Sequence, residues 1–130
     1  MKRKTPKIAE AEWLIMKILW KESPLAAREI IDRVKDASTW NPKTVKTLLN
    51  RLVKKSALGF DKEGRIYLYF PLVLEVDCAR AERHSFLNKV YNGALQPMLA
   101  AFIEERAVSA AEIKELKRIL DKIPKPDLVR

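Results

Sequence analysis

The sequence is poor in the residues from which many catalytic and metal sites are built. Its 130 residues include one cysteine, Cys78, and one histidine, His84. An intramolecular disulfide is therefore excluded, and a catalytic triad could use only His84 as its base, with no convincing partner in Cys78. No glycine-rich phosphate loop occurs either. We therefore expect no enzyme, no cofactor and no metal site.

Long hydrophobic runs are also missing. No apolar run approaches the roughly 18 to 20 residues that would span a bilayer. The basic start, MKRKTPK, is not followed by the apolar core of a signal peptide. With a single cysteine, which fits a reducing compartment, this predicts a cytoplasmic protein without membrane insertion.

Negative charge is scarce in the first half of the chain. Residues 1–70 carry 16 Lys/Arg against 8 Asp/Glu, whereas residues 71–130 carry 10 against 9. Almost all of the net charge of +9 therefore lies before residue 71. This asymmetry predicts a polyanionic partner for the first half, while the second half serves another purpose.

The stretch WNPKTVKTLLNRLVKK, residues 40–55, predicts a helix over 42–56 that carries no carboxylate. Asn41 followed by Pro42 is a helix start, with an N-cap side chain and a proline at the first position. Apolar residues recur on one face with a period of 3.6 residues. They are Val45, Leu48, Leu49, Leu52 and Val53. The opposite face and its flanks hold Lys43, Thr44, Lys46, Thr47, Asn50, Arg51, Lys54 and Lys55.

The order of the predicted elements indicates a winged helix-turn-helix. Helices are expected over 8–21 and 27–36, and two short strands over 58–70 around Gly64. The major groove of DNA admits one helix, and its base edges offer acceptors to Lys, Arg, Thr and Asn. Tyr67 and Tyr69 in the second strand could face DNA, but we expect them to pack against the helices.

Beyond Pro71 the pattern predicts three helices, over 72–92, 93–107 and 109–123, with a capping box from Ser109 to Glu112. About 50 helical residues cannot bury their long apolar stripe among themselves, so a second copy of the chain is the expected partner. The expected interface residues are Phe86, Leu87, Val90, Tyr91, Leu95, Met98, Leu99, Phe102, Ile113, Leu116 and Leu120.

The predicted fold class is therefore mainly α with a small β-hairpin. We expect a winged helix DNA-binding domain over 1–71, a helical dimerisation domain over 72–123 and a flexible tail over 124–130.

From about Ile8 to Ile123 the chain resembles the BlaI/MecI penicillinase-repressor family of bacterial transcriptional regulators. The resemblance rests on AEW with MKILW, on WNPKTVKTLLNRLVKKSAL, on KEGRIYLY and on SFLNKVYNG. It implies a homodimeric repressor that binds a palindromic operator with TACA and TGTA half-sites.

The resemblance also implies roles for single residues. Base reading is expected from Lys43, Thr44, Lys46 and Thr47, with Lys43 or Lys46 as the hypothetical partner of a guanine. Phosphate contacts are expected from Asn50, Arg51, Lys54, Lys55, Lys62 and Arg65.

Three positions depart from the family pattern. Asn41 replaces the usual serine and caps equally well, whereas Ile8-Ala9 replaces a capping serine, so the first helix is expected to fray there. In β-lactam-responsive relatives a membrane metalloprotease system leads to cleavage of an Asn-Phe bond. The matching bond, Ala101-Phe102, lacks the asparagine and is only a candidate cleavage bond. The copper-sensing branch uses a C-terminal cysteine cluster, which Cys78 alone cannot form.

Other functions remain open at this level. A winged helix that binds an acidic protein would show no preference for operator over scrambled DNA. A non-specific DNA-binding protein would lose affinity steeply with salt and show no sequence-specific binding at high salt. A small-molecule-sensing repressor is conceivable, although no residue cluster favours a ligand. For an enzyme, Glu104-Glu105 and Asp121 are the remaining candidates, and these are expected to be solvated helix charges and not a carboxylate pair.

Overall fold

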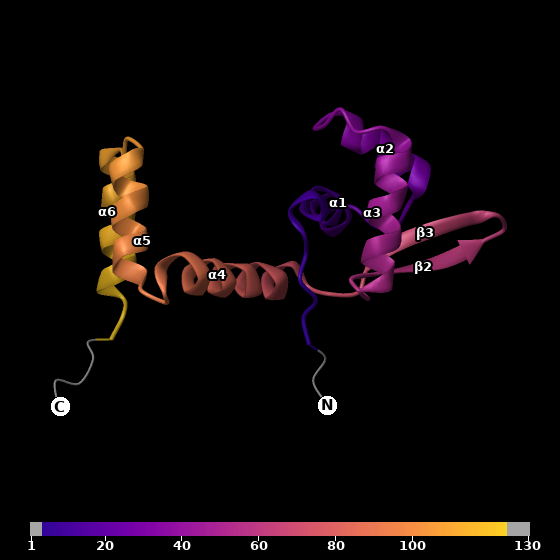
Figure 1. The fold of residues 1–130 in the computed structure, drawn as a ribbon. Helices are drawn as coiled ribbons and strands as arrows, with labels where there is room; N and C mark the ends of the chain where they lie inside the picture. The colour runs from indigo at the N-terminus through magenta and orange to yellow at the C-terminus, as the bar shows by residue number, and fades with distance from the viewer. Residues whose placement is uncertain (1–3, 125–130) are drawn as a thin grey trace. The chain divides into compact units, whose positions relative to one another are not determined.

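The structure is a computed structural model and describes residues 4–124. It divides into two compact units, one ending at Ser85 and the other beginning at Phe86. The predicted mainly α fold with a small antiparallel sheet is confirmed (Figure 1). The domain boundary after residue 71 stays a prediction, and the tail expected at 124–130 lies outside the described residues except for Pro124.

The first unit contains three helices, a small sheet and the beginning of a fourth helix. Its elements are α1 (Glu10–Lys21), β1 (Leu25–Ala26), α2 (Ala27–Lys35), α3 (Pro42–Lys54), β2 (Leu58–Glu63), β3 (Ile66–Pro71) and the first part of α4 (Glu75–Tyr91). The helix predicted over 42–56 thus ends at Lys54.

The core of this unit is built on the apolar face of α3. Val45, Leu48, Leu49 and Leu52 are buried, and Val53 packs against them from a partly buried position. They meet apolar side chains of α1, α2 and the sheet, including Ile15, Met16, Leu19, Ile30, Val34 and Leu58. Each fully buried Leu or Ile stabilises the fold by roughly 1.5–3 kcal/mol. The predicted inner face of α3 is therefore confirmed.

Local signals fix where α3 begins. The Oδ1 atom of Asn41 accepts a hydrogen bond from the Thr44 N–H at 2.9 Å, and Pro42 is the first helical residue. This pairing satisfies one of the N–H groups that the first turn leaves without a helical partner. The predicted start of α3 is confirmed.

The predicted hairpin is present, and the sheet has one strand more than expected. β2 and β3 pair in antiparallel fashion from Leu58↔Pro71 to Glu63↔Ile66, and Gly64 in the turn has a φ of +63°. β1 adds Leu25 and Ala26 on the other side of β3. This strand has only two residues, so periodicity could not reveal it.

Glu12 is the one buried charged residue of the described core, with 1% of its surface exposed. Its Oε1 atom accepts the Ala9 N–H at 2.8 Å and the Lys55 ammonium at 2.7 Å. Lys55, which caps the end of α3, also donates to the Lys7 carbonyl at 2.9 Å. Ala9 has no side chain that could cap α1, but Glu12 accepts its N–H; fraying of α1 at this end stays a prediction.

The second unit contains the end of α4 together with α5 (Leu95–Glu105) and α6 (Ala110–Asp121). The predicted capping box is confirmed: Ser109 Oγ accepts the Glu112 N–H, and the Glu112 carboxylate accepts the Ser109 N–H. Neither α5 nor α6 has a buried residue. The apolar side chains of this unit therefore remain largely in contact with solvent in a single chain. Among the described residues, no helix has the length and apolar character needed to cross a membrane.

Replacing Lys55 by Met should destabilise the protein, because it leaves the Glu12 carboxylate buried without its cation. We expect a loss of about 2 kcal/mol in the free energy of unfolding, since Lys55 remains 31% exposed and the pair is partly screened. Urea unfolding followed by tryptophan fluorescence measures the loss. Lys54→Met is the matched control, because Lys54 is exposed and has no partner among the described ion pairs; equal losses in both variants would contradict the structural role of Lys55.

Candidate nucleic-acid interface

The outward face of α3 is cationic and free of acid. None of its 13 residues is Asp or Glu. Six of the predicted DNA-contacting side chains on it are exposed, and Thr44 is half-buried beside the N-cap. The exposed ones are Lys43, Lys46, Thr47, Asn50, Arg51 and Lys54. A phosphate-lined groove would attract this face without meeting a single carboxylate on the helix.

One hydroxyl on this face has its proton already engaged. The Thr47 Oγ1 atom donates to the Lys43 carbonyl at 3.0 Å. Its remaining capacity is as an acceptor, which suits the amino groups of adenine or cytosine, and its methyl group suits the methyl of thymine. The hydroxyl of Thr47 therefore offers a partner an acceptor rather than a donor.

The ion pairs of the described residues leave the predicted DNA-contacting cations unpaired, with one exception. None of these pairs involves Lys43, Lys46, Arg51, Lys54, Lys62 or Arg65. Lys55 is the exception, since its ammonium is bound by Glu12 and by the Lys7 carbonyl. Phosphate binding was expected of Lys55 from the sequence, but the structure gives it a structural partner instead.

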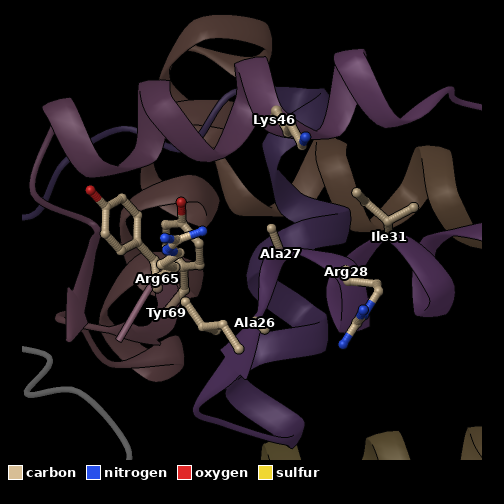
Figure 2. A pocket seen from close by; sticks show the side chains of 9 residues that line it. Ala26, Ala27, Arg28, Ile31, Lys46, Arg65 and Tyr69 are labelled. Atoms are coloured by element: carbon tan, nitrogen blue, oxygen red, sulfur yellow. The ribbon is translucent and has the colours of Figure 1, made fainter. Parts of the chain in front are cut away.

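Two grooves lie between α3 and the hairpin, each of about 530 Å³. The first, which we call the α2 groove, also borders β1 and the start of α2 (Figure 2). It is lined by Ala26, Ala27, Arg28, Ile31, Lys46, Arg65, Ile66, Tyr67 and Tyr69. The second, the hairpin groove, is lined by Thr47, Asn50, Arg51, Val53, Lys54, Phe60, Tyr67 and Tyr69. No acidic side chain lines either groove.

The two tyrosines that were expected to pack against the helices have different environments. Tyr69 is buried, and desolvation raises the pKa of its phenol, with a smaller contribution from Tyr67. Tyr67 is 43% exposed and stacks on Phe60, with ring centroids 4.7 Å apart. Lys62 places its ammonium 5.9 Å from the centre of the Tyr67 ring. Tyr69 therefore packs, whereas Tyr67 and Phe60 form an exposed aromatic surface that sequence reasoning did not assign to the site.

The basic residues of the hairpin are exposed as the DNA-binding hypothesis requires. Lys62 is on β2, and Arg65 is in the turn beside Gly64. Tyr67 and Tyr69 of β3 line both grooves, so the hairpin borders the α2 groove as well as the hairpin groove.

The residues of the predicted dimer interface lie on α4, α5 and α6. Phe86, Leu87, Tyr91 and Met98 are half-buried, whereas Val90, Leu95, Leu99, Phe102, Ile113, Leu116 and Leu120 are exposed. Phe86 packs near both Tyr91 and Phe102, with ring centroids 5.9 and 6.3 Å apart. The candidate cleavage bond, Ala101-Phe102, lies inside α5, so cutting it would first require the helix to unwind.

The described residues offer no group of three or more His, Cys, Asp or Glu side chains that could hold a metal ion. Cys78 is buried, and burial, with a smaller contribution from Asp77, raises the pKa of its thiol. His84 lies exposed on α4. The arrangement is suited to binding a polyanion through cations on α3 and the hairpin.

The chain matches the family model described as penicillinase repressor over residues 8–122. It is 44% identical to the penicillinase repressor of Bacillus licheniformis over 92% of this chain and 93% of that protein. It is 38% identical to the methicillin resistance regulatory protein MecI of Staphylococcus aureus (strain N315), over 94% and 99% of the two chains.

Two solved structures resemble the first part of the chain. The solution structure of the DNA-binding domain of the repressor BlaI superposes with a TM-score of 0.53 at 45% identity. The Bacillus licheniformis BlaI monomeric form in complex with the blaP half-operator superposes with a TM-score of 0.51, also at 45% identity. Each match covers 58% of this chain and 93% of the other. The predicted winged helix fold is thereby confirmed.

Cys78 should react slowly with a thiol reagent in the folded protein. Burial leaves 2% of the residue exposed, and the raised pKa lowers the thiolate fraction at any given pH. At pH 8 we expect labelling by a chromogenic disulfide to be about a hundredfold slower than in urea, as for an opening free energy of about 3 kcal/mol. The chain has no other cysteine, so the signal has one source. Similar rates in both states would show that Cys78 is accessible.

Proposed function

The chain belongs to the penicillinase repressor family, and on this basis we propose that it is a homodimeric transcriptional repressor that binds a palindromic DNA operator. The observation that carries the proposal is the outward face of α3, which combines exposed cations with a complete absence of carboxylates. The similar BlaI domain, solved with a half-operator, supports double-stranded DNA as the polyanion.

In this proposal α3 enters the major groove of a TACA or TGTA half-site. Lys43, Thr44, Lys46 and Thr47, on its first two turns, read base edges. Asn50, Arg51 and Lys54 follow on the next turns and, with Lys62 and Arg65 of the hairpin, contact phosphates. Lys55 is left out of the phosphate set, because Glu12 already occupies its ammonium.

The apolar side chains of the second unit supply the proposed dimer contact. Soluble monomers rarely expose a contiguous apolar patch larger than a few hundred Å². Here Val90, Leu95, Leu99, Phe102 and Leu120 are among many large apolar side chains left exposed by a single chain. A two-fold dimer would bury them and present two copies of α3 to the two halves of a palindrome.

The inducing signal stays outside the proposal. The resemblance adds a membrane sensor protease as a candidate partner and Ala101-Phe102 as a candidate cleavage bond. Residue 101 is alanine where the cleaved relatives have asparagine, and the bond is part of a helix. Neither observation favours proteolytic release over another signal.

Sequence-specific binding should appear as a gap between two duplexes in a fluorescence anisotropy titration. We expect a TACA–TGTA palindrome to bind about a thousandfold or more tightly than a scrambled duplex, with the gap persisting at about 200 mM salt. Coincident curves would instead favour the second candidate function, non-specific binding through phosphates alone.

Lys43→Gln removes one base contact of about 1–3 kcal/mol from each half-site, so for a dimer on the palindrome it should reduce that gap by about 30-fold or more. Lys54→Gln is the matched control, because Lys54 is expected to contact phosphate. It should weaken binding to both duplexes by a similar factor and leave their ratio unchanged. If Lys43→Gln also left the ratio unchanged, Lys43 would not be a base-reading residue.

Phe102→Asp should convert the protein from dimer to monomer, because a buried unpaired carboxylate costs about 3 kcal/mol or more. Sedimentation velocity would then show at least a hundredfold weaker self-association. Glu105→Gln, an exposed change on the same helix, is the control and should remain dimeric. A Phe102→Asp protein that stays dimeric, with its helical circular dichroism intact, would place the interface elsewhere.

A further inference from the structure

The α2 groove has cations from α2, α3 and the hairpin, and one of them, Arg28, has no role in the contacts assigned so far. Arg28 and Ile31 line it from α2, Lys46 from α3, and Arg65 with Tyr69 from the hairpin; Figure 2 shows Arg28 and Arg65 on opposite sides of Ala26 and Ala27. Of the 9 residues that line it, three are cationic and none is acidic. The three positive charges repel one another, and a bound anion relieves this repulsion.

Arg28 is the cation that neither the charge pattern nor the resemblance singled out. It lies at the second position of α2 and is exposed, and no ion pair among the described residues involves it. The nearby Glu29 carboxylate is turned to the backbone, where it accepts the Ala26 N–H at 2.8 Å. The guanidinium of Arg28 is therefore available to a partner outside the chain.

A second arginine on the same helix makes the contrast clear. Arg33 holds the Glu22 carboxylate with two hydrogen bonds of 2.9 and 3.0 Å. This contact lowers the pKa of Glu22 and raises that of Arg33. Arg33 is thus satisfied within the fold, whereas Arg28, one turn before Ile31 on the side of α2 that lines the groove, is not.

The size of the neighbouring side chains leaves room for a backbone to approach. Ala26 and Ala27, where β1 meets α2, present only methyl groups to the groove. Exposed Ile66 and half-exposed Tyr67 give the opposite side an apolar surface. A sugar ring fits such apolar walls, while its phosphate meets the cations of the groove.

We propose that the α2 groove receives a phosphate of the operator backbone and that Arg28 binds it, while Arg65 contacts a separate phosphate from the hairpin. Lys46 then lies on the inner side of this phosphate, toward the bases that α3 reads. Together with the contacts proposed for α3 and the hairpin, this contact fixes the DNA strand to three elements and so sets the register of α3. This inference rests on the function proposed above and adds to it a phosphate-positioning residue, Arg28.

The test is the salt dependence of binding by Arg28→Gln. Each lost phosphate contact makes the slope of log K against log salt less steep by about 0.9, so a dimer on a palindrome should change by about 1.8. Binding to operator and scrambled duplexes should weaken by a similar factor. Arg28→Lys keeps the charge and should retain a slope near that of the wild-type protein.

Arg83→Gln is the matched control for the loss of one positive charge, because Arg83 is exposed on α4 and does not line the α2 groove. Its slope should equal that of the wild-type protein. Thermal unfolding midpoints that agree among all these variants would show that the folds are intact. An Arg28→Gln slope equal to the Arg83→Gln slope would overturn the inference.

Operator duplexes with single neutral methylphosphonate linkages locate the contact. One linkage in each half-site should weaken the wild-type protein and have no further effect on Arg28→Gln; equal weakening of both proteins at every linkage would overturn the assignment. The two proposals fail separately. A wild-type protein without operator preference would contradict the proposed function, yet a flatter Arg28→Gln slope would still support the phosphate contact.

Discussion

The fold of the first unit depends on a single buried carboxylate that three segments share. A charge with 1% exposure is tolerated only when hydrogen bonds and an opposite charge replace the lost water. Glu12 obtains both from Ala9 and Lys55, and Lys55 in turn holds the Lys7 carbonyl. The start of α1, the segment before it and the end of α3 are thereby fixed to one another. The apolar face of α3 holds the helix in the core, whereas this polar contact fixes the position of the end of α3 relative to α1.

The same contact explains why neighbouring cations have different roles. Lys54 and Lys55 are adjacent in sequence, yet Lys54 faces solvent beside the hairpin groove while Lys55 turns inward to Glu12. On α2, Arg33 is held by Glu22 whereas Arg28 borders the α2 groove. The ion pairs of the first unit thus use cations other than the exposed ones of α3, Arg28 and the basic residues of the hairpin. The positive charge that remains is concentrated where a nucleic acid would bind.

Sequence reasoning predicted those features that depend on neighbours along the chain. Asn41 and Pro42 mark the start of α3, the period of 3.6 residues marks its buried face, and Gly64 marks the hairpin turn. It could not assign Lys55, because the partner, Glu12, lies 43 residues away. It missed β1, which exists only because β3 offers it a partner, and it missed Arg28, whose role depends on a groove formed by α2, α3 and the hairpin. Long-range contacts decide such features, and no local pattern reports them.

The proposed dimer offers a physical reason for the uneven distribution of charge along the chain. Two copies of a half that carries 16 basic against 8 acidic residues repel each other, so a dimer contact placed there would oppose its own formation. The second half, with 10 against 9, is nearly neutral and leaves its apolar side chains exposed. Self-association can then rest on apolar burial, which depends little on salt, while DNA binding rests on phosphate contacts, which depend on it steeply. Rising salt would release the operator long before it separated the two copies, so the protein would leave DNA as a dimer.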